Sequence, residues 1–91
     1  MLKINLWPES RNFLEKVPQK HRKQLATKLS LLRKNPFPVR SKKLEGFEPL
    51  YRLRSGDYRI VYFVSKDILN IPLIESRNDD KIYRRIRNLL R

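Results

Sequence analysis

The sequence contains no cysteine and one histidine, and these two shortages exclude several kinds of site. Without cysteine there is no disulfide bond, no thiolate nucleophile and no zinc site built on cysteine ligands. A single histidine excludes a histidine pair that would share a metal or an acid–base step. We expect this residue, His21, to lie on the surface of a helix beside Lys20 and Arg22, without a catalytic role.

Long hydrophobic stretches are also missing. The longest uncharged run, from Ile68 to Ile74, is far shorter than a membrane span, and the N-terminus lacks the apolar core of a signal peptide. The absence of cysteine fits a reducing compartment. We therefore expect a soluble cytoplasmic protein without membrane contact.

Acidic residues are scarce relative to basic ones. The chain has 9 Asp and Glu against 22 Lys and Arg, a formal net charge of +13, and the basic residues pervade the sequence. Such an excess favours a polyanionic partner. Hydrophobic residues make up 40% of the chain, which is enough for one modest core. A chain of 91 residues is too short to form two domains with separate cores. We expect a single domain over residues 1–91.

The apolar pattern of the first half predicts a strand followed by two helices. The strand covers residues 2–6, the first helix 8–17, and the second helix runs from Pro18 to about Lys34, where Asn35-Pro36 ends it. The two helices form an antiparallel hairpin with a basic outer surface. The second helix buries a leucine stripe made of Leu25, Leu29 and Leu32.

In the second half the pattern changes to the alternation typical of strands. Four strands are predicted, at 42–44, 50–55, 58–64 and 68–75, and they form an antiparallel meander. Gly56-Asp57 provides a two-residue turn between the second and third of them. Pro72 has no amide donor, so we expect it at a free edge or a bulge.

A last helix is predicted at the C-terminus. Asn78, Asp79 or Asp80 can cap it, and Ile82 and Ile86 begin its apolar stripe. The expected fold class is α+β, with an N-terminal helical hairpin packed on an antiparallel sheet of four to five strands and a C-terminal helix.

The two-residue turn places three arginines on one face of the hairpin. Side chains two residues apart share a face, so Arg52, Arg54 and Arg59 project together, away from Tyr58 and Ile60. Neighbouring like charges destabilise a sheet, and guanidinium groups match phosphate geometry, which indicates an anion site. The alternative is that they are solvated residues of an arginine-rich surface.

Two further candidate residues follow the last predicted strand, and an acidic group begins at its end. Tyr83, downstream of Arg77, either packs along the helix stripe or has a functional role. The carboxylates of Glu75, Asp79 and Asp80 are too few for a magnesium site, and helix capping explains the aspartates better. We expect no metal and no cofactor.

The order of these motifs resembles the RelE/ParE superfamily of type II toxins, in its RelE-like branch. The similarity covers nearly the whole chain, including the helical hairpin that ends at Asn35-Pro36. It is carried by Lys43-Leu44-Glu45-Gly46, the stretch from Leu50 to Tyr62, Ser76-Arg77 and Ile82-Tyr83. The resemblance implies the RelE-like microbial ribonuclease fold, with a C-terminal helix that an antitoxin can displace. Active RelE-like members cut messenger RNA in the ribosomal decoding site.

The resemblance also implies roles for single residues. Arg52 and Arg54 become substrate-binding residues of the strand, where the best-known enzymes carry lysines. Arg59 becomes a phosphate-contacting catalytic arginine, Arg77 acts on the leaving group or transition state, and Tyr83 is the late catalytic tyrosine. Cleavage by the ribose 2′-hydroxyl needs a base for that oxygen and stabilisation of the negative charge on the phosphorane. Tyr83 is the candidate base, because nearby guanidinium groups favour the ionised form of a phenol.

The leading hypothesis is a ribosome-dependent mRNA endoribonuclease that inhibits translation without a metal. Its expected partners are a cognate acidic antitoxin, the ribosome and mRNA. The presence of Arg59, Arg77 and Tyr83 together favours this branch. Two alternatives remain, a ParE-like inhibitor of DNA gyrase without nuclease activity and a non-catalytic basic RNA-binding module.

Overall fold

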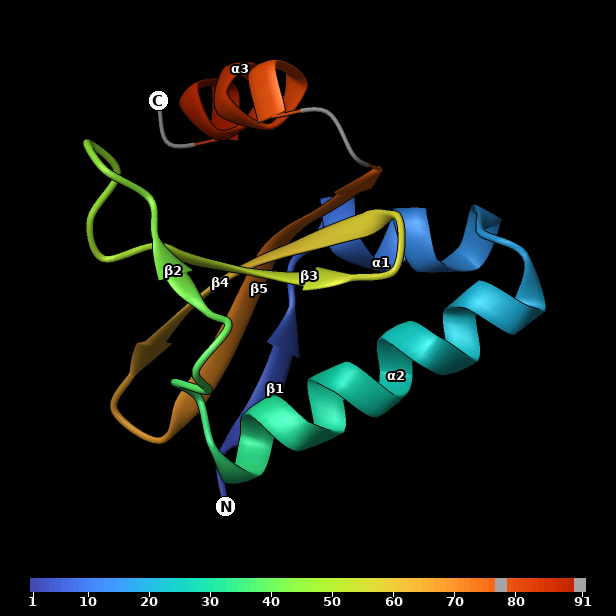
Figure 1. Cartoon of the computed structure of the whole chain (residues 1–91), viewed down its shortest axis with the longest axis horizontal. Helices are drawn as coiled ribbons and strands as arrows, with labels where there is room; N and C mark the ends of the chain where they lie inside the picture. The colour runs from blue at the N-terminus through green and yellow to red at the C-terminus, as the bar shows by residue number, and fades with distance from the viewer. Residues whose placement is uncertain (77–78, 90–91) are drawn as a thin grey trace.

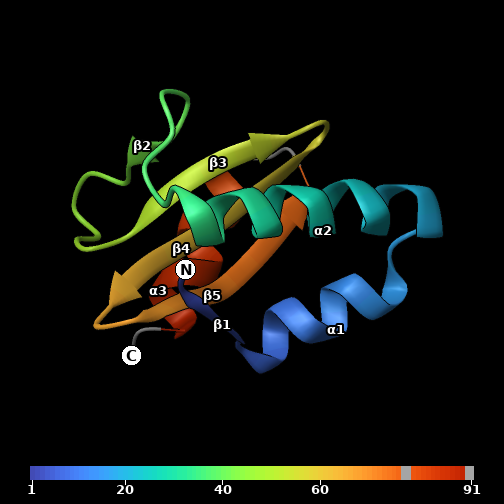
Figure 2. The same cartoon turned by 90° about the horizontal axis from the view of Figure 1, so that it is seen from below.

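The computed structural model describes residues 1–76 and 79–89 of the chain. A single sheet lies between two layers of helices, with α1 and α2 on one face and α3 on the other (Figures 1 and 2). The helices are α1 (Pro8–Lys16), α2 (Gln19–Lys34) and α3 (Asp79–Leu89). The strands are β1 (Lys3–Leu6), β2 (Lys42–Lys43), β3 (Tyr51–Ser55), β4 (Tyr58–Ser65) and β5 (Ile68–Ser76). The predicted α+β class, helical hairpin and C-terminal helix are confirmed.

The sheet is mixed, whereas the sequence predicted an antiparallel one. Its strand order is β1-β5-β4-β3-β2, and the four later strands form the predicted antiparallel meander. β1 instead runs parallel to β5, with Leu6 beside Ile71. The side chain of Asn5 donates a hydrogen bond to Asn70 at 2.9 Å across this pair. The alternation of a strand reveals its faces but not its neighbour, so the sequence did not determine this pairing.

Pro72 lies at a bulge, as predicted. Val61 pairs with Leu73 but Phe63 pairs with Asn70, so Ile71 and Pro72 together face the single residue Tyr62. The register shift accommodates a residue that cannot donate to the ladder.

Each face of the sheet has its own core. On the first face the predicted stripe of Leu25, Leu29 and Leu32 is buried against Leu53 and Ile60. On the second face Ile82 and Ile86 of α3 pack on Val61, Leu73, Leu44 and Leu50. Each helix layer covers one face of the sheet with apolar side chains. Both sides of the central strands are therefore buried, although the chain is short. In the described part of the chain no helix has the length and apolar character needed to cross a membrane.

Candidate functional site

The β3–β4 hairpin has the register that the sequence predicted. Arg54 pairs with Arg59 and Ser55 with Tyr58, and Gly56 takes a φ of +60° in the connecting turn. Leu53 and Ile60 point into the core under α2. Arg52, Arg54 and Arg59 therefore share the opposite face, which is the face that α3 covers.

The three arginines differ in their exposure. Arg54 is exposed and Arg52 is partly buried, whereas Arg59 is only 3% exposed. Arg59 lies directly opposite Glu75 of β5, which is 6% exposed and carries the opposite charge. The interpretation as solvated surface residues fits Arg54 and is wrong for Arg59. Because a buried charge needs a partner of opposite charge, Arg59 contributes to the structure of the sheet in addition to being a candidate site residue.

A second arginine approaches Glu75 from α3. One terminal nitrogen of Arg85 lies 3.2 Å from Glu75, and Arg85 also donates a hydrogen bond to Glu9 of α1 at 2.7 Å. The carboxylate of Glu75 further accepts a hydrogen bond from the backbone N–H of Ser76 at 3.1 Å. Glu75 is thus engaged with a cation and an amide. Among the described residues, no group of three or more His, Cys, Asp or Glu is arranged to hold a metal ion.

Tyr83 lies on the other flank of α3. Successive helix residues are rotated by about 100°, so Tyr83 and Arg85 stand on either side of the stripe formed by Ile82 and Ile86. The ring of Tyr83 packs against Phe47, with centroids 5.4 Å apart and planes inclined by 33°. Packing therefore accounts for part of the role of Tyr83, and its catalytic role stays a prediction. Arg77 lies outside the described residues.

A basic groove adjoins Arg52 and Arg54 at the edge of the sheet. Its volume is about 550 Å³, and three further basic residues line it, Lys28 of α2, Arg40 of the following loop and Lys42 of β2. Sequence reasoning missed these three because they are distant from Arg52 and Arg54 along the chain. Their basic character was visible, but only the fold brings them to one groove.

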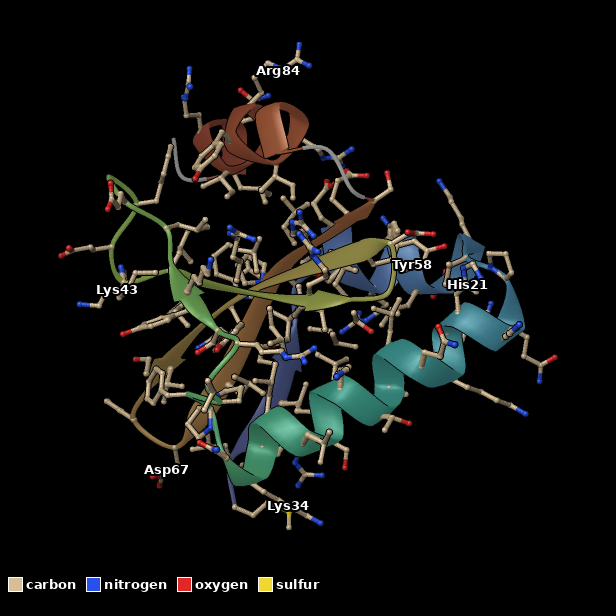
Figure 3. All side chains as sticks on the ribbon, in the orientation of Figure 1. His21, Lys34, Lys43, Tyr58, Asp67 and Arg84 are labelled. Atoms are coloured by element: carbon tan, nitrogen blue, oxygen red, sulfur yellow. The ribbon has the colours of Figure 1, made fainter. Side chains whose placement is uncertain are left out.

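His21 is placed differently from the prediction. It is partly buried, and its Nδ1 lies 2.6 Å from the hydroxyl oxygen of Tyr58 (Figure 3). The rings of His21 and Tyr58 meet edge-on with centroids 5.3 Å apart, and Phe13 also meets Tyr58 edge-on, at 5.6 Å. The expected surface position was wrong because the tip of the β3–β4 hairpin reaches the start of α2. This cluster anchors the strand end that carries Arg54 and Arg59.

Comparison with known proteins places the chain in a family. Residues 5–88 match the family described as ParE toxin of type II toxin-antitoxin system, parDE. This small basic α+β domain therefore belongs to the ParE toxin family, and so to the RelE/ParE superfamily of type II toxins. No curated protein matches the sequence significantly.

Solved structures of RelE toxins share the fold. The RelE of an archaeal RelE–RelB complex from Pyrococcus horikoshii OT3 is 26% identical, with a TM-score of 0.74, over 85% of this chain and 96% of that one. The isolated E. coli RelE toxin is 22% identical, with a TM-score of 0.74, over 100% of both chains. A YoeB dimer from Staphylococcus aureus is 20% identical, with a TM-score of 0.68, over 85% of this chain and 98% of that one.

Proposed function

We propose that this toxin is a ribosome-dependent mRNA endoribonuclease that inhibits translation. The observation that carries the proposal is the set of arginines on one face of the β3–β4 hairpin, Arg52, Arg54 and Arg59, continued by the basic groove. A net charge of +13 suits an RNA substrate, since phosphate neutralisation supplies much of the affinity for nucleic acids. The likeness to RelE structures supports the same branch.

The proposed chemistry divides among residues of this chain. Arg52 and Arg54 hold the RNA backbone, and Arg59 stabilises the extra negative charge that forms on the phosphorane. Tyr83 accepts the proton of the attacking 2′-hydroxyl, and Arg77 assists the departing 5′-oxygen. The attack forms a 2′,3′-cyclic phosphate and breaks the bond to the 5′-oxygen, whose developing negative charge Arg77 stabilises until it takes a proton from solvent, so no water molecule is consumed in this step.

The position of α3 sets a condition on this chemistry. Arg59 is 3% exposed on the face that α3 covers, and it lies opposite the buried carboxylate residue Glu75 in the sheet. A phosphate that contacts Arg59 therefore requires a shift of α3, which also carries Tyr83. We infer that the described arrangement is a resting state and that binding to the ribosome favours a more open one.

The proposed partner in the resting cell is a cognate acidic antitoxin. Similar RelE toxins have been solved as complexes with RelB antitoxins, from Pyrococcus horikoshii OT3 and from E. coli. The strong positive charge of this chain would speed association with an acidic protein. Association should therefore slow markedly as the Debye length falls from about 30 to about 8 Å.

A second candidate function is inhibition of DNA gyrase, which the ParE description of the family favours. Two assays on the purified full chain separate the candidates. One measures protein synthesis in a cell-free translation system, and the other measures supercoiling by purified gyrase. The ribonuclease proposal predicts that translation stops at toxin concentrations that leave supercoiling unchanged. The reverse result would support gyrase inhibition, and no effect in either assay would support a non-catalytic RNA-binding module.

A further inference from the structure

A group of aromatic and amide side chains lies at the β1 edge of the sheet. The neighbouring strands β1, β5 and β4 lie side by side there (Figure 2). Asn5, Asn70 and Phe63 occupy paired positions on these three strands and so share one face of the sheet. Trp7 meets Phe63 edge-on, with ring centroids 6.1 Å apart. We call these four residues the Trp7 patch.

The Trp7 patch lies on the same face of the sheet as the three arginines of the β3–β4 hairpin. Phe63 packs against the second core, which α3 covers, so the patch borders the area under that helix. Along β4, Phe63 follows Arg59 by four residues, which corresponds to about 13 Å in a strand. When α3 moves aside, as contact of a phosphate with Arg59 requires, an RNA strand held by the arginines reaches the patch without leaving the sheet.

The amide of Asn70 is used at its oxygen and open at its nitrogen. The oxygen accepts hydrogen bonds from the amide of Asn5 at 2.9 Å and from the indole N–H of Trp7 at 3.5 Å. Because an indole nitrogen only donates, the atom of Asn70 that faces it is the oxygen, and the amide nitrogen points away. Asn70 is 8% exposed, yet in the described part of the chain this nitrogen has no hydrogen-bond partner, and it is not fully enclosed. It is therefore a nearly buried donor that a ligand can satisfy.

The backbone holds Trp7 in place at the junction of β1 and α1. Its N–H donates a hydrogen bond to the carbonyl oxygen of Ile71 at 3.1 Å, and its own carbonyl oxygen accepts one from the N–H of Arg11 at 3.0 Å. Pro8 follows at the first position of the helix, and the Trp7 side chain stays partly exposed. An aromatic ring that is already fixed and partly exposed loses little conformational entropy when a ligand stacks on it.

We propose that the Trp7 patch binds a nucleobase of the RNA substrate, which stacks on the indole ring and accepts a hydrogen bond from the amide of Asn70. The nature of the ligand rests on the proposed function. One common way to bind single-stranded RNA uses aromatic side chains on neighbouring strands of a sheet, with polar groups that read the edges of the unstacked bases. Stacking on an aromatic ring suits every base. Lys3, exposed on the same face of β1, supplies charge for the adjoining phosphate.

Trp7 is the only tryptophan in the chain, so its fluorescence reports on the patch alone. The full chain is titrated with a short single-stranded RNA whose 2′-hydroxyls are methylated, which prevents the proposed cleavage. Stacking of a base should quench the emission in a saturable way. The control is an abasic strand with the same number of phosphates. It should still bind the arginines, as followed by the anisotropy of a label on the strand, but leave the emission unchanged.

Variants test the contacts one at a time, with the affinity read from the labelled RNA. Trp7→Leu keeps an apolar side chain but removes the ring, and should weaken binding by about tenfold, the loss expected when one base no longer stacks. The matched control Phe37→Leu removes an exposed ring beyond the end of α2 and should leave the affinity unchanged. Asn70→Asp keeps the accepting oxygen but removes the donor. It should weaken binding more than Ser65→Asp, which adds the same charge on the same face of β4. Thermal melts verify that each variant folds.

These results decide on the patch independently of nuclease activity. Bound RNA with unchanged Trp7 emission, no RNA binding, equal quenching by the abasic strand, or equal affinity of Trp7→Leu and wild type overturns the proposal. Equal losses for Asn70→Asp and Ser65→Asp overturn the hydrogen bond from Asn70. Trp7-dependent RNA binding by a chain that cuts no mRNA keeps this inference and rejects the proposed ribonuclease. Cleavage of mRNA by a chain whose Trp7 emission no RNA changes rejects the patch alone.

Discussion

Arg85 in the C-terminal helix donates a hydrogen bond to Glu9 in the first helix, at 2.7 Å, so helices on opposite faces of the sheet are joined directly. The other terminal nitrogen of Arg85 lies 3.2 Å from Glu75. The side chains of Arg85 and Glu9 are 41% and 44% exposed, whereas that of Glu75 is 7% exposed. The contact of Arg85 with Glu9 is therefore exposed to solvent, whereas its contact with Glu75 is largely buried on the Glu75 side. The two contacts should contribute differently to the free energy of unfolding.

We predict that Glu75→Gln destabilises the fold far more than Glu9→Gln. Glu75 is buried opposite Arg59 and beside Arg85, and loss of its charge should cost about 1–3 kcal/mol. The exposed pair with Glu9 should contribute below about 1 kcal/mol because solvent screens it. Urea unfolding of both variants gives the two free energies. Equal losses would show that the buried and exposed contacts are equivalent, contrary to this account.

Substitution of Arg59 tests its role in catalysis without removing the buried charge. Arg59→Lys keeps a cation opposite Glu75 but loses the bidentate fork, so single-turnover cleavage should fall on the order of 10²-fold. The matched control is Arg84→Lys, since Arg84 points from α3 to solvent (Figure 3). A variant at Arg59 that cleaves as fast as the control would remove this residue from the proposed mechanism.

The hydroxyl and the ring of Tyr83 can be tested separately. Tyr83→Phe keeps the packing on Phe47 and should leave the melting temperature unchanged, while a missing general base should lower cleavage by roughly 10²–10⁴-fold. Tyr83→Ala should lower both cleavage and stability. If Tyr83→Phe cleaves normally, the tyrosine serves only packing.

Tyr62 makes stability depend on alkaline pH. Its hydroxyl donates a hydrogen bond to the carbonyl oxygen of Pro36 at 2.7 Å, and burial raises its pKa. The unfolded chain loses this proton near pH 10, so the contribution is complete below about pH 10 and is lost as the pH rises through the higher folded-state pKa. Tyr62→Phe should cost about 1 kcal/mol at neutral pH and flatten the decline above pH 10. Parallel pH curves for the two proteins, measured by urea unfolding, would contradict the assignment.

The sequence predicted local structure and side-chain faces well, because both depend on short-range patterns. The turn at Gly56 determined which side of the sheet Arg52 and Arg54 occupy, and the missing donor of Pro72 predicted a bulge. Both features follow from backbone geometry within one hairpin or one residue.

The features that the sequence did not predict depend on how distant segments meet. The parallel pairing of β1 with β5, the contact of His21 with Tyr58 and the burial of Arg59 beside Glu75 each join residues from separate elements. A basic residue in an arginine-rich chain has no local feature that separates a buried position from a solvated one. The basic groove was missed for the same reason, since Lys28, Val39 and Arg54 meet only in the fold.

The most direct test of the ribonuclease account is cleavage mapping on programmed ribosomes. The purified chain is added to ribosomes that hold a defined mRNA, and the positions and the chemical ends of the products are determined. The account predicts cuts confined to the decoding site, with a 2′,3′-cyclic phosphate on the upstream product and a 5′-hydroxyl on the downstream product. Intact mRNA under these conditions, or a 3′-hydroxyl on the upstream product, would contradict it.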